Sequence, residues 1–249
     1  MSVQELRFGI TKWIAWGHGL EACQVFNESP ADSRRPLRDD RGDYWVSLPA
    51  LLHRRISSIG QNAFRACSAL GMQEDPARFV FCSRFGELDR TLRILRSLSD
   101  GEPVSPADFS LSVHNALVGL FSIASKNPQG HTALAAGADT FAYGLTEAIA
   151  MLRDGSNRAV LLVYYEEALP QPYEDDTEVS ETAVVFAAAL EPSTDRRGEI
   201  VLTCERLENP NVRRSASAQC RAFIDFLRSG GLELRYTSDR VEWRWQRCV

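Results

Sequence analysis

The segment from Gly130 to Gly137 (GHTALAAG) contains the residue types that could support nucleophilic chemistry. A short strand-like run ends there in small residues, and the apolar spacing from Ala138 to Leu152 predicts a helix directly behind it. A nucleophile in such a strand-turn-helix elbow benefits from the helix N-terminus, which lowers the pKa of a thiol. Small residues let the backbone turn sharply and leave space for a substrate. The central residue here is Leu134, whose hydrocarbon side chain cannot act as a nucleophile.

Leu134 has two interpretations. It is either an ordinary core leucine at the end of a buried strand, or the residue that stands where the nucleophile of such an elbow would be. Both interpretations predict that Leu134 does no chemistry. His131, just before the elbow, could mimic a general base, but it has no nucleophile to serve, so we expect a structural role for it.

The other titratable residues do not form a recognisable metal or disulfide pattern. No two cysteines form a CxxC pair, so we expect reduced core thiols and no bound metal at Cys23, Cys67, Cys82, Cys204, Cys220 and Cys248. Adjacent carboxylates occur at Glu166-Glu167 and at Glu174-Asp175-Asp176. Runs of this kind usually lie in a solvated loop, and that is our expectation for both.

The composition excludes several classes of protein. The chain has 249 residues and a net charge of −5, whereas a general nucleic-acid binder is normally basic. No stretch reaches the roughly 18 uncharged apolar residues that would span a bilayer. The first residues carry Glu5 and Arg7 before any apolar run, which predicts no signal peptide. We therefore expect a cytoplasmic protein.

Strands that alternate with helices, followed by strand after strand, predict a mixed α/β sheet of five or more strands covered by helices. We expect one domain over residues 1–249, with residues 1–50 irregular. The predicted helices are 56–70, 85–98, 109–124, 138–152 and 216–228. The predicted strands are 78–83, 132–136, 158–165, 182–190 and 199–206, with a last amphipathic strand in the run 235–247.

The order of these motifs resembles the β-ketoacyl synthase family. In that family the elbow reads Thr-Ala-Cys-(small)-(small)-Gly and precedes a helix, a turn and an apolar strand. Here Thr132 to Gly137 read TALAAG, and Asp154-Gly155 form the turn before the strand. SVHNALVGLFSIA (112–124) is similar to the helix that lines the family's acyl tunnel, and FCSRFGELDRT (81–91) is similar to an earlier strand-to-helix turn. The resemblance is strongest over residues 50–190 and implies the N-terminal half of a thiolase-like fold.

The departures from the family pattern concern its catalytic residues. Leu134 occupies the position of the nucleophilic cysteine. Ketosynthases also use two histidines and a lysine from their C-terminal half, and no His-Gly-Thr segment is present here to take that role. The histidines of this sequence are His18, His53, His114 and His131. The resemblance therefore implies a chain that does not catalyse condensation alone, and it implies no metal and no other cofactor.

Within this family, subunits that lack the cysteine pair with an active ketosynthase and are called chain length factors; truncated members are associated with aryl polyene biosynthesis. The resemblance implies such a partner subunit, which would dimerise with an active β-ketoacyl synthase and shape the acyl tunnel for a chain tethered to acyl carrier protein. We expect dimer contacts at the strand 158–165 or its neighbours and at the helix 109–124. The candidate tunnel or interface residues are His114, Asn115, Leu120, Phe121, Leu134 and Phe141, each of which could instead be an ordinary core residue.

Two other functions stay open. One is an acyl-thioester hydrolase or decarboxylase with a non-cysteine mechanism, for which Ser112 and His131 would be the residues to test. The sequence has no GxSxG motif, and Ser112 has no obvious base. The other is a freestanding acyl-binding scaffold protein.

Overall fold

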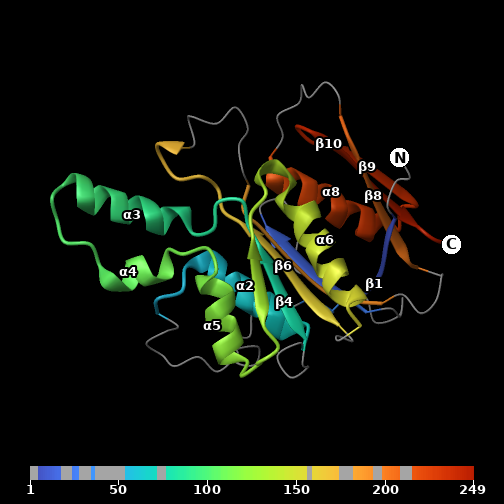
Figure 1. Ribbon diagram of the computed structural model, residues 1–249, viewed down its shortest axis with the longest axis horizontal. Helices are drawn as coiled ribbons and strands as arrows, with labels where there is room; N and C mark the ends of the chain where they lie inside the picture. Colours follow the sequence, from blue (N-terminus) through green and yellow to red (C-terminus); the bar gives the residue numbers. More distant parts are fainter. Residues whose placement is uncertain are drawn as a thin grey trace.

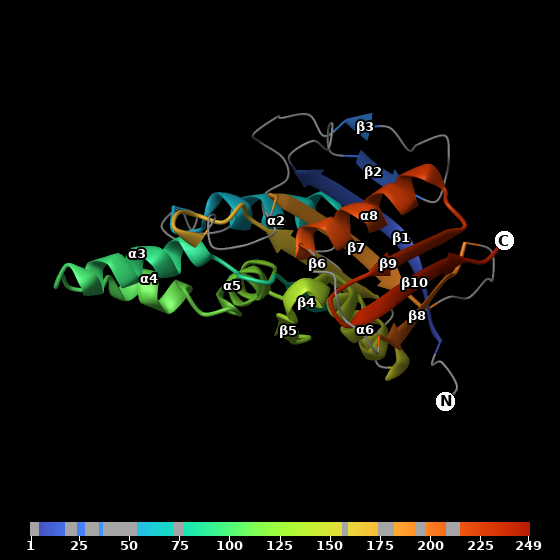
Figure 2. The same ribbon diagram turned by 90° about the horizontal axis from the view of Figure 1, so that it is seen from above.

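The computed structural model describes residues 5–17, 24–27, 35–36, 54–71, 77–155, 159–173, 182–192, 198–207 and 215–249. These residues form one sheet with helices on both faces, and a pair of helices that extends away from the sheet (Figures 1 and 2). The prediction of a helix-covered mixed sheet is confirmed. Within the described residues, no helix is long and apolar enough to cross a membrane.

Eight strands lie side by side in the order β5-β4-β6-β7-β1-β8-β10-β9, and β2 and β3 attach beside β1. The pairs β5-β4 and β4-β6 are parallel, and all the others are antiparallel. The strands are β1 (Leu6–Gly17), β2 (Gln24–Asn27), β3 (Arg35–Pro36), β4 (Arg78–Cys82), β5 (His131–Leu134), β6 (Val160–Glu166), β7 (Val184–Glu191), β8 (Ile200–Arg206), β9 (Glu233–Thr237) and β10 (Val241–Arg247).

The sheet separates two apolar cores. Helices α6 (Thr140–Arg153) and α8 (Ala216–Ser229) cover one face, and α2 (Ser58–Ala69) and α5 (Ala116–Ala124) cover the other. Side chains of β6 alternate between them: Val160, Leu162 and Tyr164 lie in the first core, and the intervening residues lie in the second. This explains why the strand reads as a continuous apolar run, since a strand buried on both faces has no polar side.

Helices α3 (Leu88–Ser99) and α4 (Pro106–Leu111) form the extension (Figure 2). The buried guanidinium of Arg90 joins them to the body. It donates to Asp108 of α4 at 2.7 Å, to Glu87 at 3.2 Å and to the Arg55 carbonyl at 2.6 Å. These three hydrogen bonds stabilise the attachment of α3 and α4. The bonds to Asp108 and Glu87 join opposite charges, and the bond to the Arg55 carbonyl satisfies a backbone acceptor.

The prediction that residues 1–50 are irregular was wrong for β1, a twelve-residue strand in the middle of the sheet. The register of β1 against β7 shifts between Ile10 and Lys12. Beyond this bulge Trp13, Ile14 and Ala15 are buried consecutively. Trp13 and Ala15 lie in the first core and Ile14 in the second, so this half of β1 is buried on both faces, whereas the half before the bulge is only partly buried. Neither a regular alternation nor one long apolar run therefore marks the whole strand.

Two other elements differ from the prediction. The single helix 109–124 is two helices, because α4 ends at Leu111 and α5 begins at Ala116. Ser112 ends the first by donating its hydroxyl to the Phe109 carbonyl at 2.9 Å. The predicted last strand, in the run 235–247, is instead the hairpin of β9 and β10, which turns at residues 238–240.

The contact between α6 and β4 depends on Gly144. A Cβ at this glycine would lie 2.4 Å from Cys82 Sγ and 3.0 Å from Cys82 Cβ. Gly144→Ala should therefore lower the free energy of unfolding by about 1–3 kcal/mol, measured by urea denaturation. Gly119→Ala in α5 is the matched control, since nothing lies within 4 Å there and alanine favours a helix by up to about 1 kcal/mol. Equal stability of the two variants would contradict this packing.

Candidate functional site

The predicted elbow is present between β5 and α6. Leu134 ends β5, and a short 3-10 helix, Gly137–Asp139, leads into α6. Gly137 has a φ of 61°, which a glycine adopts without strain. The Thr140 hydroxyl accepts from the Ala136 N–H at 2.9 Å and donates to the Gly137 carbonyl at 2.7 Å. These two bonds fix the turn on which a nucleophile would be displayed.

Leu134 is half-buried and packs against the first core. Its carbonyl accepts from the Ser83 N–H at 3.2 Å, and it lies in register with Cys82 of β4. Both interpretations of this leucine describe part of its environment, since it packs like a core residue and also stands in the elbow. Its side chain offers no atom that could form an acyl intermediate.

The thiol nearest to Leu134 in register cannot replace a nucleophile. Cys82 has no exposed surface, and its Sγ donates to the Val163 carbonyl at 3.5 Å. Burial raises the pKa of the Cys82 thiol far above its ordinary value, and the Glu166 carboxylate raises it further. A thiol in this state does not supply the thiolate that nucleophilic catalysis requires.

The structure describes two of the histidines, His131 and His114. His131 is exposed at the opposite end of β5 from Leu134. His114 lies in the break between α4 and α5, where its Nε2 is 2.9 Å from the Ser83 carbonyl oxygen. This contact gives the half-buried imidazole a structural partner. His18 and His53 lie outside the described residues.

The other candidate residues differ in how much of their surface is exposed. Phe121 and Phe141 have no exposed surface: Phe121 stacks among the aromatic rings of the second core, and Phe141 among those of the first. Asn115 is exposed directly before α5, and Leu120 is half-buried on it. Of these four, only Asn115 and Leu120 present atoms to the surface, and a role for any of them in a tunnel or interface stays a prediction.

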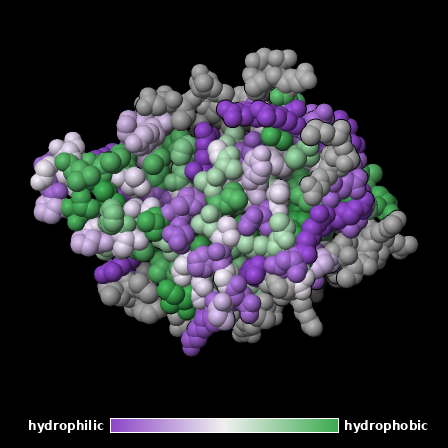
Figure 3. Space-filling model, viewed as in Figure 1, coloured by the Kyte–Doolittle hydropathy of each residue, from purple (hydrophilic) through white to green (hydrophobic). Residues whose placement is uncertain are grey.

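An apolar surface borders the elbow. Within the described part of the chain β5 pairs with β4 alone, so its other edge is free, whereas β6 is buried between β4 and β7. The strand 158–165 therefore cannot itself meet a partner, but β5 can. Ile123 of α5 is 69% exposed, Val113 52% and Phe109 63%. Figure 3 shows apolar side chains gathered over α3, α4 and α5.

The expectation that Glu166 lies in a solvated loop was wrong, because it ends β6 and is 1% exposed. Its carboxylate accepts from the Arg84 N–H at 2.7 Å, the Phe85 N–H at 3.4 Å and the Ser83 hydroxyl at 3.3 Å. Glu166 thereby holds the turn from β4 to α3. The sequence signal was that a glutamate directly follows a continuous apolar strand. The second acidic run, Glu174 to Asp176, lies outside the described residues.

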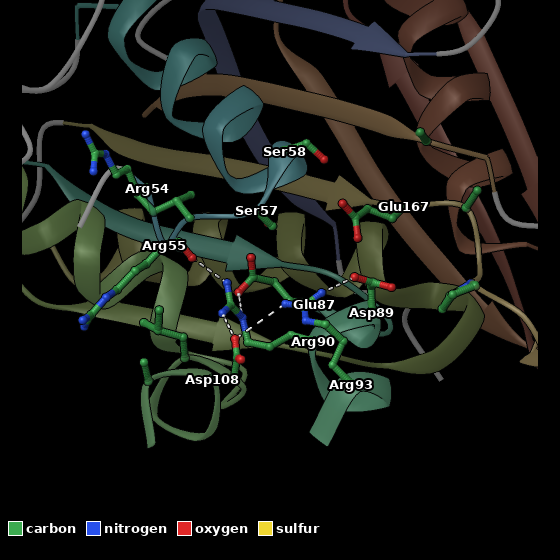
Figure 4. Close-up of a pocket in the computed structure, with 16 residues that line it drawn as sticks. Arg54, Arg55, Ser57, Ser58, Glu87, Asp89, Arg90, Arg93, Asp108 and Glu167 are labelled. Atoms are coloured by element: carbon green, nitrogen blue, oxygen red, sulfur yellow. Dashed lines mark hydrogen bonds and ion pairs between the residues drawn. The ribbon is translucent and has the colours of Figure 1, made fainter. Parts of the chain in front are cut away.

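Glu167 lines a pocket of about 780 Å³ between the start of α2, the α3–α4 pair and the chain after β6 (Figure 4). The pKa of Glu167 is raised to about 7, first by desolvation on burial and then by the charges of Glu87 and Asp89, while the Ile59 N–H and Arg93 act in the opposite direction. Half of the residues that line the pocket are charged: Arg54, Arg55, Arg90, Arg93, Glu87, Asp89, Asp108 and Glu167. Among the described residues, no group of three or more His, Cys, Asp or Glu side chains is arranged to hold a metal ion.

On the face of the sheet covered by α6 and α8, the C-terminal β9–β10 hairpin holds the elbow in place. Asp139 is buried just after the turn, and its carboxylate accepts from the Trp243 indole at 2.6 Å and from the Gln219 amide at 3.5 Å. The Tyr143 ring meets Trp243 edge-on, with centroids 5.0 Å apart. The β9–β10 hairpin and α8 therefore help to determine where α6 begins.

The elbow, the mixed sheet and the two covering layers define a ketosynthase-like α/β protein. Residues 27–246 match the family model described as the N-terminal domain of β-ketoacyl synthase. The chain belongs to this family, and the resemblance drawn from the sequence is confirmed.

Comparison with solved structures gives the same family. A chain in the complex of the ketosynthase ApeO with its chain length factor ApeC, from Xenorhabdus doucetiae, is 26% identical with a TM-score of 0.75; the match covers 97% of this chain and 100% of that one. The ishigamide ketosynthase/chain length factor is 14% identical, with a TM-score of 0.57, over 90% of this chain and 74% of its own. The complex AntDE:AntF, a type II polyketide synthase acyl-carrier protein with its ketosynthase, is 11% identical, with a TM-score of 0.61, over 98% of this chain and 99% of its own. A search of curated proteins finds no significant match to the sequence.

The burial of the thiols predicts their reactivity. Iodoacetamide on the native chain, followed by peptide mass spectrometry, should label the exposed Cys204 and leave Cys67, Cys82 and Cys220 unlabelled until the chain is unfolded. Cys204 should itself react more slowly than free cysteine, because burial and Asp139 raise its pKa. Labelling of native Cys82 at the rate of Cys204 would contradict the assignment of Cys82 as an inert core thiol.

Proposed function

We propose that the chain is a non-catalytic, chain-length-factor-like subunit that pairs with an active β-ketoacyl synthase. In this role it stabilises the synthase and shapes its acyl tunnel during fatty acid- or polyketide-type elongation of a chain on acyl carrier protein, as in aryl polyene biosynthesis. The observation that carries the proposal is the elbow, whose backbone is intact and whose nucleophile position holds Leu134.

The surroundings of the elbow support the absence of condensing activity. Cys82 is buried with a raised pKa, His114 is engaged by the Ser83 carbonyl, and His131 lies at the far end of β5. Condensation needs a nucleophile with groups that bind the thioester oxygen and promote decarboxylation. In the proposed pair, the partner subunit supplies both the nucleophile and these binding groups.

The alternative of a hydrolase or decarboxylase has less support. Ser112 is the serine that it would use, and the Ser112 hydroxyl donates to the Phe109 carbonyl at the end of α4. No histidine or carboxylate accepts a hydrogen bond from this hydroxyl among the described residues, so nothing activates it as a nucleophile.

The free edge of β5 and the apolar surface of α5 are the parts of the molecule best suited to a partner subunit. An unpaired strand edge can continue a sheet across an interface. An obligate partner is also expected to cover a large apolar area, and the exposed Ile123 belongs to α5, which contacts β5. Resemblance to the ApeO–ApeC complex supports a ketosynthase as the occupant.

Co-expression with a ketosynthase encoded beside this chain tests the pairing. Affinity purification through this chain should recover the synthase, and Ile123→Glu should reduce the recovery by at least about tenfold, because it buries an unpaired charge in the interface. Leu232→Glu is the matched control: Leu232 is 61% exposed, lies before β9 and should leave recovery unchanged. The proposal fails if no synthase co-purifies, or if the isolated chain turns over acyl thioesters.

The length of the product tests the tunnel role. In the reconstituted pair, Leu120→Trp should shift the products toward shorter chains, because one methylene of pocket depth changes discrimination by about 1–3 kcal/mol. Leu98→Trp, on the projecting α3, should leave the length distribution unchanged, which mass spectrometry of the released chains measures. An unaltered distribution in Leu120→Trp would remove Leu120 from the tunnel.

A further inference from the structure

The pocket beside α3 has a carboxylate oxygen with no partner. Glu87 Oε2 accepts from Arg90 Nε at 3.2 Å, but Glu87 Oε1 is buried and has no hydrogen-bond partner in the described structure. The Glu87 side chain is 10% exposed. Figure 4 shows this oxygen pointing away from Arg90, toward the side of the pocket where Ser57 and Glu167 lie. A buried carboxylate oxygen without a donor costs free energy that a ligand can recover.

A second carboxylate faces the same space from the opposite wall. Glu167 follows β6, and within the described residues it forms no ion pair. The negative charges that act on Glu167 are those of Glu87 and Asp89. The carboxylates on the Glu167 side of the pocket therefore carry more negative charge than the arginine side chains on that side neutralise.

The arginines of the pocket do not neutralise this side. Arg90 is occupied by Glu87, Asp108 and the Arg55 carbonyl, and Arg93 pairs with Asp89 and Asp108. The guanidinium groups of Arg54 and Arg55 lie at the other side of the pocket from Glu167 (Figure 4). The volume of about 780 Å³ is in the range of sites that bind small organic ligands.

We propose that this pocket binds a cationic organic group, a guanidinium or an ammonium, between Glu87 and Glu167. Such a group donates directionally to Glu87 Oε1 and compensates the Glu167 carboxylate. The Ser58 side chain, which borders the same space, supplies a further polar contact. This binding does not depend on the proposed partner role, because every residue it uses belongs to this chain.

Ethylguanidine and its uncharged isostere ethylurea are the probes, titrated into the full-length ¹⁵N-labelled chain and followed by amide chemical shifts. Ethylguanidine should bind at least tenfold more tightly than ethylurea at pH 8. Its affinity should fall about tenfold between pH 8 and pH 6, because the pKa of Glu167 is about 7 and binding at lower pH must first release a proton.

The charged groups that set this pH dependence come from each wall. They are Glu87 at the start of α3, Asp89 and Arg93 on α3, Asp108 on α4 and the N-terminus of α2 beside Ile59. Glu167→Gln should weaken ethylguanidine binding at least tenfold at pH 8 and abolish its pH dependence. Glu87→Gln should weaken it to a similar extent and move the pH dependence to lower pH, because the Glu87 charge helps to raise the pKa of Glu167.

Asp225→Asn is the matched control, since the Asp225 side chain is 71% exposed on α8, away from the pocket. It should bind ethylguanidine as the unsubstituted chain does. Equal affinity for the two probes, or equal weakening in Asp225→Asn, would overturn the site. If Glu87→Gln does not fold, Glu167→Gln alone decides. Repeating the titration on the complex with a ketosynthase identifies the source of the cation. Loss of ethylguanidine binding in the complex means that a cationic side chain of the partner occupies the pocket. Unchanged binding means that the pocket takes a free small ligand.

Discussion

The buried carboxylate of Glu166 is the constraint on which the functional end of the sheet depends. A charge at the end of a fully buried strand is stable only if donors surround it, because desolvation of an unpaired carboxylate costs several kcal/mol. The Tyr164 hydroxyl donates from the same strand, and the other donors are the Ser83 hydroxyl and the N–H groups of Arg84 and Phe85, so Glu166 dictates the conformation of the turn after β4. That turn delivers Glu87 and Arg90 to the pocket, and its Ser83 carbonyl is the partner of His114. One buried charge thus connects β6, the start of α3 and the break between α4 and α5.

The elbow is held by interactions that do not involve the residue at its centre. Thr140 closes the turn through two backbone groups, Asp139 is fastened by Trp243, and Gly144 lets α6 approach Cys82 of β4. None of these contacts uses the side chain at position 134. A leucine can therefore occupy that position while the backbone keeps its shape, because its hydrocarbon packs against the first core. This separation explains how the backbone of the elbow can keep its shape in a chain that carries a leucine at its centre.

The sequence predicted the elements whose burial is uniform or strictly periodic. Strand β6 was predictable because both faces are covered, and α2 and α6 because one face packs against the sheet. Strand β1 was not, since it is partly buried before its bulge and buried on both faces after it, and the break before α5 contains a contact between His114 and the distant Ser83 carbonyl that the local sequence does not reveal. The strand-turn-helix arrangement around Leu134 was predictable from the small residues of the turn and the apolar spacing behind it, whereas the assignment of Leu134 to a nucleophile position came from the family resemblance and stays a prediction. Glu166 and Glu167 were misjudged because adjacent acids usually lie in solvent, and only the tertiary structure brings the turn donors and α2 to them.

Among the described strands β5 pairs on one side alone, and its second edge is the physical basis of the proposed partner role. A free strand edge in the middle of an apolar surface is unfavourable for an isolated protein, because it exposes hydrogen-bonding groups that template further pairing. Natural edges are usually protected by charges, proline or a covering element. The edge of β5 is short and carries His131 and Thr132, which limits its exposure, but the exposed Ile123 of α5, which contacts β5, adds apolar area instead of charge. Such a surface favours a second subunit over solvent. Because Leu134 ends this same strand, a subunit paired along β5 would lie beside the elbow, where the shape of this chain could limit the space open to a growing acyl group.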